Sequence, residues 1–381
     1  MKVAILFTGI GVLPGRTNNV SGHLQFPIKT AEILQVKGHD VTILATRQSD
    51  GTALPAILPE GVRVVIVSDG RRRGQFGKQN YRDGYVFHRL LQQLYQTIKV
   101  IREEDFDLIH VFGYERMMRL GGILKISSGK PVVVTVLGQK PSGWFTFLYK
   151  YVSRALFLTE SVRDRWLHAV ANTEVVYPGV VRKMRLDNFK PAIQNTRTRV
   201  LFWREASELG GGDVCMDAFE KLAPMYPHLS FDFAVRSNRN EVGNLDELGD
   251  RYHNINVYRF PYKDGLSLEQ LIDQSLVVVL PFRGLSVEPQ MAVVETLSVG
   301  CPVICTDIGC LPELVVDGEN GWLVRRESSD DIVNTLCREL RDINKLNLMR
   351  TEISRRFNEK WNWSSYQNKV EHIYTMLCSE K

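Results

Sequence analysis

The sequence of 381 residues contains only six cysteines, has no long apolar run and carries only a slight excess of positive charge. Its six cysteines form no Cys-x-x-Cys pair and stand beside no histidine cluster, which argues against a disulfide framework and against a zinc site. No apolar run approaches the ~20 residues that a membrane-spanning helix needs. The net charge of +5 permits attraction to an anionic ligand or membrane face but requires neither. We therefore expect a cytoplasmic protein with reduced thiols and no metal site.

The chain is long for a single hydrophobic core, and two domains of ordinary size are expected. The first residues could be mistaken for a signal peptide, but they contain one basic residue and no small-residue cleavage site. A buried strand over residues 2–7 is the better interpretation. The loop that follows contains glycines without the spacing of a dinucleotide-binding motif, because Pro14 stands where the third glycine belongs.

Strand patterns alternate with helical patterns along the chain, which is typical of an α/β protein with parallel sheets. The alternation stops in a basic, proline-containing segment, residues 182–199, and then restarts. We therefore predict a first domain over residues 1–182 and a second over residues 196–360. A last helical segment is expected over residues 361–381.

Residues 276–324 have the clearest pattern in the chain. A β-branched apolar run ends at Pro281, and Glu288 and Pro289 follow a short loop. Proline suits the first position of a helix because its missing N–H would be unpaired there, and this helix is expected to stop at Gly300. Two further strands and their turns complete a strand–loop–helix–strand unit. In such units ligands bind where strands end and helices begin.

This stretch resembles the donor-binding signature of glycosyltransferase family 4, also described as glycosyl transferases group 1, retaining enzymes of the GT-B fold. The family has two glutamates separated by seven residues, then a Gly-x-Pro-Val segment, a Gly-Gly-x-Pro-Glu turn and an Asn-Gly turn. Here Glu295 and residues 300–303, 309–313 and 320–321 stand in the corresponding places. The resemblance implies two Rossmann-like domains that face each other across a cleft, with residues 361–381 packed back on the first domain.

The resemblance also implies an activity. The enzyme would move a sugar from a nucleotide diphosphate-sugar, such as a UDP- or GDP-sugar, to the hydroxyl of a glycan, lipid-linked or small-molecule acceptor. The resemblance further implies retention of configuration and a role in the synthesis of a cell-surface polysaccharide, glycolipid or glycoconjugate. It implies no cofactor, no metal and no nucleic acid. Peripheral contact with the cytoplasmic membrane face could use the aromatic segment 144–151 and the basic loop 71–82, although an ordinary core helix and a solvated loop are the favoured explanation. A nucleotide-sugar 2-epimerase and a non-catalytic partner subunit of the same fold stay open as alternatives.

Two glutamates are the first candidate site residues. Seven residues at ~100° each return almost to the starting direction of a helix, so Glu288 and Glu295 are expected to share one face. The resemblance assigns the ribose hydroxyls of the donor to Glu295. Glu288 is one residue out of register with the family, and Val287 holds the strict position. Either the loop is one residue shorter or Glu288 has another role near the sugar, and we include it as catalytic.

Arginines and a helix start are expected to hold the diphosphate. The resemblance gives this role, and a catalytic one, to Arg204 at the end of the first strand of the second domain. Gly210 replaces the family lysine expected next, and Arg236 and Arg239 could supply the missing charge. Free N–H groups and the helix dipole favour phosphate at the start of the helix before Gly300. The residues concerned there are Pro289, Gln290 and Met291.

The first domain matches the family more loosely. Gly22 and His23 stand where the family has a Gly-Gly turn near the donor phosphate and the acceptor. His110 matches the first histidine of a family strand end, or is a structural residue. Leu137 stands where the family often has a histidine near the sugar.

Overall fold

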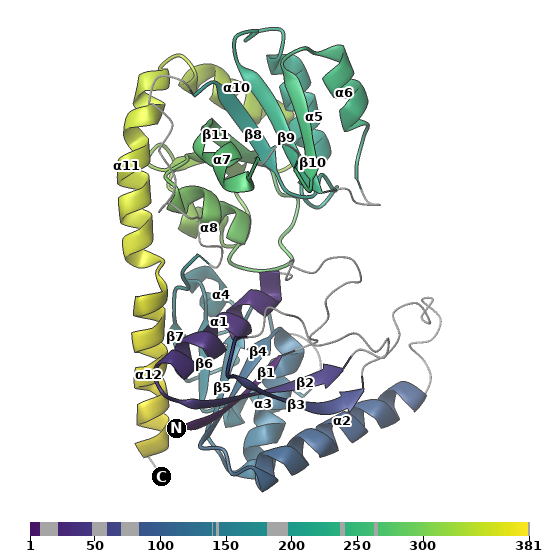
Figure 1. Ribbon diagram of the computed structural model, residues 1–381, viewed down its shortest axis with the longest axis vertical. Coiled ribbons are helices and arrows are strands. Elements are labelled where there is room, and N and C mark those ends of the chain that lie inside the picture. The colour runs from purple at the N-terminus through teal and green to yellow at the C-terminus, as the bar shows by residue number, and fades with distance from the viewer. Residues whose placement is uncertain are drawn as a thin grey trace. The chain divides into compact units, whose positions relative to one another are not determined.

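The computed structural model describes residues 1–7, 22–47, 59–69, 84–138, 140–141, 145–180, 197–236, 241–262 and 266–379. The chain divides into two compact units, one of Met1–Val181 with Trp363–Lys381 and one of Arg182–Asn362. Each unit contains one sheet with helices packed on it (Figure 1). The basic loop 71–82, Trp144 and Arg239 lie outside the described residues.

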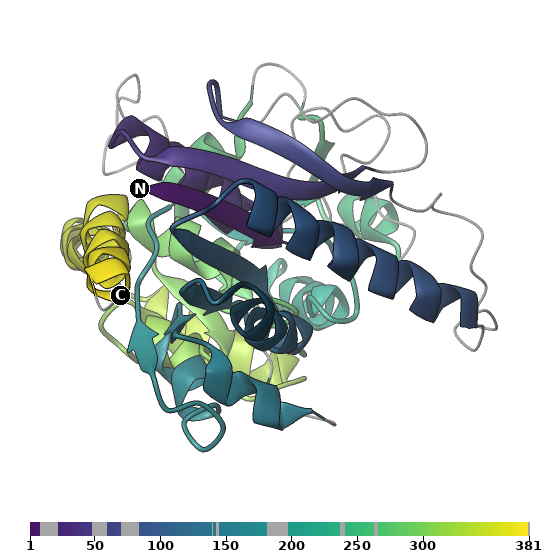
Figure 2. The same ribbon diagram turned by 90° about the horizontal axis from the view of Figure 1, so that it is seen from below.

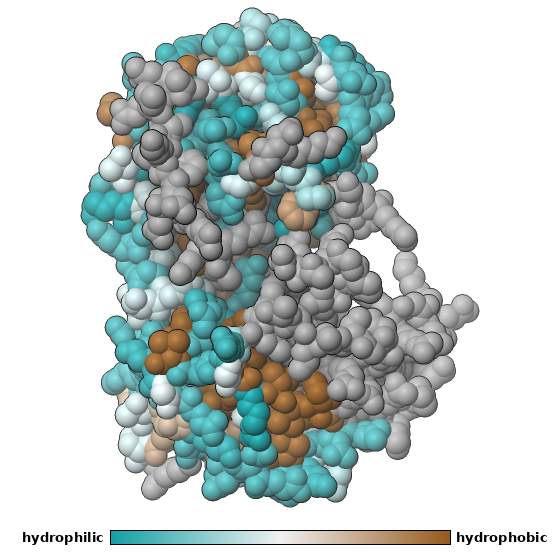
Figure 3. Space-filling model, in the orientation of Figure 1, coloured by the Kyte–Doolittle hydropathy of each residue, from teal (hydrophilic) through white to brown (hydrophobic). Residues whose placement is uncertain are grey.

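The first unit contains a seven-stranded sheet in the order β3-β2-β1-β4-β5-β6-β7. All neighbouring strands are parallel. The strands are β1 (Lys2–Phe7), β2 (Asp40–Arg47), β3 (Arg63–Asp69), β4 (Leu108–Gly113), β5 (Val132–Val136), β6 (Arg154–Phe157) and β7 (Thr173–Val175). The chain order reverses between β1 and β4, which makes this pair the topological switch point of the sheet. In Figure 3 an apolar area lies where Figure 1 shows β2 and the edge strand β3.

Helices cover both faces of this sheet. They are α1 (Gly22–Val36), α2 (Gly84–Glu103), α3 (Glu115–Ser128), the 3-10 helix η2 (Thr146–Tyr151), α4 (Glu160–Asp164) and α12 (Trp363–Ser379). Side chains alternate between the faces along a strand, and Ile109 and Val111 of β4 pack in one cluster with Met118 of α3. In Figure 2 the blue helices α2 and α3 lie on one side of the sheet and the yellow α12 lies on the other.

Helix α12 is joined to the first unit through buried polar groups. The hydroxyl oxygens of Tyr366 and Thr30 lie 3.0 Å apart, and the Tyr374 hydroxyl forms a hydrogen bond with Nδ1 of His110. Nε2 of His110 lies 2.7 Å from the Thr135 hydroxyl. Both ring nitrogens of this fully buried histidine are therefore engaged, and burial lowers its pKa to about 3. His110 is thus a neutral structural residue, which was one of its two interpretations.

The second unit contains a six-stranded sheet in the order β10-β9-β8-β11-β12-β13, again with parallel neighbours. The strands are β8 (Arg199–Trp203), β9 (Ser230–Arg236), β10 (Ile255–Phe260), β11 (Ser275–Leu280), β12 (Val303–Thr306) and β13 (Gly321–Val324). All six residues of β11 are buried, as expected for a parallel strand covered on both faces. The predicted α/β class with two parallel sheets is therefore confirmed.

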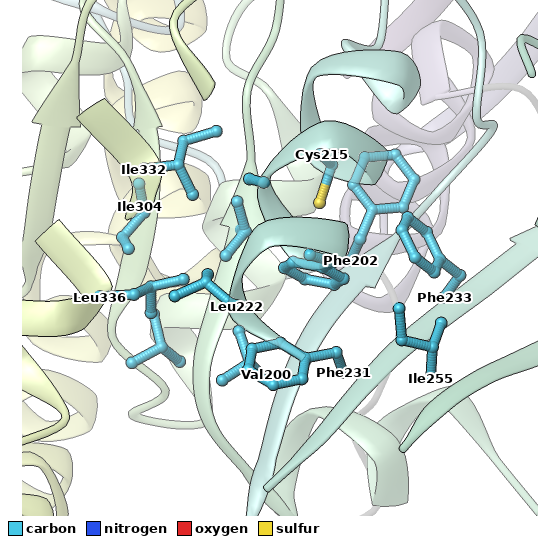
Figure 4. Packing of buried hydrophobic residues seen from close by; sticks show 14 of the residues in the cluster. Val200, Phe202, Cys215, Leu222, Phe231, Phe233, Ile255, Ile304, Ile332 and Leu336 are labelled. Atoms are coloured by element: carbon cyan, nitrogen blue, oxygen red, sulfur yellow. The ribbon is translucent and has the colours of Figure 1, made fainter. Parts of the chain in front are cut away.

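The helices of this unit surround a core rich in phenylalanine (Figure 4). They are α5 (Gly212–Leu222), α6 (Leu245–Arg251), α7 (Leu268–Asp273), α8 (Met291–Ser298), α9 (Leu311–Leu314), α10 (Ser329–Glu339) and α11 (Ile343–Lys360). The ring centroid of Phe219 lies 5.3 Å from that of Phe231 and 5.0 Å from that of Phe233. These contacts fix α5 on the strands that lead to the candidate site.

Candidate functional site

The strand order of the second sheet indicates where a ligand would bind. The chain proceeds from β8 outward to β10 and then returns to place β11 on the other side of β8. In open α/β sheets, ligands bind beyond the carboxyl ends of the two strands at such a reversal. Arg204 directly follows β8, and Pro281 and Phe282 directly follow β11. These residues therefore flank the switch point.

Arg204 is held in place by an aromatic ring and an amide. Its guanidinium lies 4.7 Å from the centre of the Phe282 ring, and its Nη1 donates a hydrogen bond of 3.3 Å to Oε1 of Gln290. Its Nε is buried and has no hydrogen-bond partner among the described residues. Burial lowers the pKa of Arg204, but an arginine remains charged at neutral pH. The site thus presents an oriented cation, one of whose N–H groups has no hydrogen-bond partner among the described residues.

Gln290 links Arg204 to the loop that carries Glu288. While its Oε1 accepts from Arg204, its Nε2 donates a hydrogen bond of 3.0 Å to the carbonyl oxygen of Val287. The Gln290 side chain is 6% exposed. A second link to α8 comes from Trp203, whose indole N–H donates to the hydroxyl of Thr296 at 3.1 Å. The end of β8 and the start of α8 are therefore fixed to each other by side chains.

The predicted start of α8 is wrong. The helix begins at Met291 with Gln290 as its N-cap, so Pro289 lies in the loop before it, and the helix ends at Ser298. A residue that precedes proline is biased away from helical backbone angles, which places Glu288 outside the helix. The prediction that Glu288 and Glu295 share a helical face is therefore wrong too.

Both glutamates are nevertheless buried parts of this region. Each is 4% exposed, Glu295 within α8 and Glu288 in the loop. Gly309, which follows β12, approaches Glu288 so closely that a Cβ atom there would lie 2.8 Å from its Oε2. The φ angle of Gly309 is +55°, a backbone conformation that suits glycine. The Gly309–Glu313 turn is thus packed against the carboxylate of Glu288.

Cys310 is a further neighbour of Glu288. It is fully buried, and burial together with the adjacent Glu288 carboxylate raises the pKa of its thiol well above the ordinary value. A neutral thiol is a weak nucleophile. Cys310 therefore packs in the site without being activated for covalent chemistry.

The loop at Gly210 has no room for the lysine found in the family. A Cβ atom on Gly210 would lie 2.8 Å from the carbonyl oxygen of Glu205, and one on Gly211 would lie 1.8 Å from the carbonyl oxygen of Pro281. The loop after β8 therefore packs directly on the loop after β11. Its close approach explains why glycines, and no long side chain, occupy this position.

Sequence reasoning did not identify Arg283, which joins the same two loops. Its guanidinium donates two hydrogen bonds of 2.5 Å to Asp213 and one of 3.0 Å to the carbonyl oxygen of Glu208. The hydrogen bonds from Arg283, together with its positive charge, lower the pKa of Asp213. Its position just after β11 was the available signal, since a strand-end arginine in a parallel sheet faces the ligand edge.

Arg236 lies at the same edge of the sheet. It ends β9, and its guanidinium lies 5.5 Å from the ring centre of Phe260 at the end of β10. Phe260 is 47% exposed. A second arginine with an exposed aromatic neighbour therefore ends the strand adjacent to β8.

The candidates of the first unit are less fully defined. Gly22 and His23 form the beginning of α1, but the side chain of His23 lies outside the described part of the structure. Leu137, which follows β5, is 1% exposed and apolar. Within the described parts of the chain, no group of three or more His, Cys, Asp and Glu residues could hold a metal ion. No helix in those parts is long and apolar enough to cross a membrane.

Two family models match the chain. The model described as Glycosyl transferases group 1 matches residues 198–342, and the model described as Glycosyltransferase Family 4 matches residues 28–183. The chain belongs to this glycosyltransferase family. The enzyme class predicted from residues 276–324 is therefore confirmed.

Individual relatives of this glycosyltransferase are distant. An uncharacterised glycosyltransferase of Methanocaldococcus jannaschii is 25% identical over 297 residues, which cover 73% of this chain and 78% of the relative. The structure of HepE from Anabaena with UDP has a TM-score of 0.72 at 16% identity and covers 99% of this chain and 100% of that one. HepE has also been solved with UDP-glucose. Sucrose-phosphate synthase from Thermosynechococcus elongatus has a TM-score of 0.71 at 14% identity over 100% of both chains. The likeness shows the GT-B fold.

Proposed function

We propose that this glycosyltransferase moves a sugar from a nucleotide diphosphate-sugar to an acceptor hydroxyl, with retention of configuration. The observation that carries the proposal is Arg204, whose guanidinium is held against Phe282 at the switch point and whose Nε has no hydrogen-bond partner among the described residues. A guanidinium binds phosphate oxygens through parallel hydrogen bonds, so a diphosphate is the anion that suits it. The complexes of HepE with UDP and UDP-glucose support this assignment.

We assign the other donor-binding roles from the positions of residues in the second unit. Met291 and the rest of the first turn of α8 present backbone N–H groups and the positive end of the helix dipole to phosphate. Glu295 accepts the ribose hydroxyls, since a carboxylate can accept two hydrogen bonds at once. Glu288 contacts the sugar, and Arg236 supplies additional positive charge. Pro289 and Gln290 shape the loop between Glu288 and the start of α8.

The chemistry requires no nucleophile from the protein. The bond between the anomeric carbon and the diphosphate oxygen breaks, and the acceptor oxygen bonds to the same carbon from the same face. The acceptor proton passes to an oxygen of the departing diphosphate. Arg204 stabilises the negative charge that develops on this leaving group, which is how an oriented cation lowers a reaction barrier.

The acceptor is the less defined substrate. We place the reaction in the cytoplasm, in the synthesis of a cell-surface polysaccharide, glycolipid or glycoconjugate, with a glycan, a lipid-linked sugar or a small molecule as acceptor. Gly22 and His23 contribute to phosphate and acceptor binding at the start of α1. A lipid-linked acceptor would bring the enzyme to a membrane face.

Calorimetric titration with UDP and GDP tests the donor site. Replacing Arg204 with glutamine removes charge-assisted hydrogen bonds worth about 1.5–3 kcal/mol, so binding of the preferred nucleotide should weaken roughly ten- to a hundredfold. Arg251→Gln is the matched control, because that arginine of α6 is exposed and pairs with Glu220 and Glu247. Equal affinities of the wild type and the Arg204 variant would refute the assigned site.

Product analysis separates the proposed reaction from its alternatives. A nucleotide-sugar panel should give slow hydrolysis and, with acceptor, a glycoside whose anomeric configuration by NMR matches the donor. An inverted product contradicts retention. Free nucleotide with an unsaturated sugar would indicate a 2-epimerase, and neither binding nor turnover would indicate a non-catalytic subunit.

A further inference from the structure

One stretch of the first unit is rich in positive charge. Residues 116–159 contain seven lysines and arginines and no aspartate or glutamate. The rest of the chain has a slight excess of acidic residues, because the whole chain carries 48 basic and 43 acidic side chains. Residues 116–159 are therefore, like the basic loop 71–82 and the basic segment 182–199, more positively charged than the chain as a whole.

The fold brings two parts of this stretch together. Helix α3 packs against η2 so closely that a Cβ atom on Gly122 would lie 2.2 Å from the carbonyl oxygen of Leu148. Lys125 and Ile126 follow Gly122 by three and four residues and so lie on the same side of α3. Ile126 is 58% exposed. An exposed apolar residue and a lysine of α3 thus follow, by one helical turn, the glycine that packs against η2.

The segment at η2 presents aromatic rings to solvent. Phe145 is 59% exposed and Phe147 is 57% exposed, with ring centroids 6.0 Å apart. The ammonium of Lys150 lies 5.1 Å from the ring centre of the partly exposed Tyr151. Large aromatic side chains gain most from leaving water, so two neighbouring exposed phenylalanines indicate a contact surface.

Phe145 and Phe147 stay exposed because a buried residue holds η2 to the core. Tyr149, which lies between Phe147 and Tyr151 in the sequence, is fully buried, and its hydroxyl donates a hydrogen bond to the carboxylate of Glu115. Its ring centroid lies 5.6 Å from that of the fully buried Trp166. Because Tyr149 holds η2 to the core, Phe145 and Phe147 cannot turn inward without breaking these contacts.

We propose that Phe145 and Phe147 insert into the interface of an anionic membrane, with Lys125 and Lys150 near the lipid phosphates. Interfacial binding combines buried apolar area with attraction between basic side chains and anionic lipids. Both terms are present here, and residues 116–159 contribute no acidic side chain that would repel such a surface. The proposal is independent of Arg204, Glu288 and Glu295, since these donor residues lie in the second unit and the residues of the proposed surface lie in the first.

Vesicle flotation of the full chain tests this proposal. We expect binding to vesicles of phosphatidylcholine with phosphatidylglycerol, weakening at high salt, and little binding to phosphatidylcholine alone. The double change Phe145→Ser and Phe147→Ser should reduce the partition coefficient at least tenfold. Lys150→Gln should reduce it roughly fivefold, the effect of about one surface charge.

Matched controls separate membrane docking from other causes. Leu348→Ser removes a 77% exposed apolar residue from α11 in the second unit and should leave flotation unchanged. Unchanged melting temperature and nucleotide affinity of the Phe145/Phe147 variant would show that it is folded and that docking is separate from donor binding. Absence of flotation with anionic vesicles, or flotation unaffected by the double change, would overturn the proposal and leave a protein partner as the occupant of this surface.

Discussion

His110 is expected to make the stability of the first unit depend on pH. Its buried ring is kept neutral, with a pKa of about 3, whereas a histidine in an unfolded chain titrates near 6.5. As the pH falls below about 6.5, the unfolded state gains a proton that the folded state does not bind. Stability is therefore lost progressively from about pH 6.5 down to about pH 3, and the loss levels off below that.

The size of this effect follows from the two pKa values. Each pH unit between them costs about 1.4 kcal/mol, so acidification from pH 7 to pH 5 removes about 2 kcal/mol of unfolding free energy through this one residue. Hydrogen exchange of peptides covering β4, corrected for intrinsic exchange rates, measures the opening free energy of the first unit. His110→Gln should lower that free energy at pH 7 and flatten its decline by about 2 kcal/mol between pH 7 and pH 5.

Two comparisons decide the matter. His228→Gln removes an exposed histidine from the second unit and should leave the pH dependence of β4 exchange unchanged. If His110→Gln and the wild type decline equally between pH 7 and pH 5, His110 is not held neutral and the reasoning from burial is wrong.

Two glycine substitutions test the packing of the donor site. Gly309→Ala should weaken nucleotide-sugar binding at least tenfold with little change in melting temperature, because its Cβ atom would lie 2.5 Å from Cδ1 of Leu285 and 2.8 Å from Oε2 of Glu288 and would displace both side chains. Gly318→Ala, also at positive φ but with open space around it, is the control for backbone strain, and equal affinities of the two variants would contradict this reason. Gly211→Ala should lower the melting temperature of the second unit by several degrees, because its Cβ atom would lie 1.8 Å from the carbonyl oxygen of Pro281. Gly129→Ala is the control, because Gly129 has the same φ of +72° and no atom within 4 Å of an added Cβ. It should lower the melting temperature less, and a larger decrease than that of Gly211→Ala would contradict the packing argument.

Local sequence patterns predicted the fold class because each parallel strand and each helix leaves its own periodic signal. The continuous apolar run of β11, for example, is readable without any knowledge of its neighbours, since a strand buried on both faces must be apolar throughout. Ordered motifs over residues 276–324 predicted the family. The sequence shows that aromatic residues cluster in the segment 144–151. Only the buried contact between Tyr149 and Trp166 explains why the other rings of η2 face solvent.

The start of α8 was missed because two rules compete at Pro289. Proline is favoured at the first position of a helix, but it also disfavours helical angles in the residue before it. Packing of the Glu288 loop against Gly309 decides between them, and that contact joins residues 21 positions apart. Helical spacing therefore gave a false relation between Glu288 and Glu295.

The sequence by itself determined the class of the protein, its family and the identity of most candidate site residues, since these depend on residue types and their order. Only the tertiary structure decided what those residues touch. Arg204 lies on Phe282, Arg283 joins Asp213, and His110 is enclosed beneath α12. Each contact joins separate segments of the chain, and such contacts follow from strand order and close packing, which no local spacing encodes.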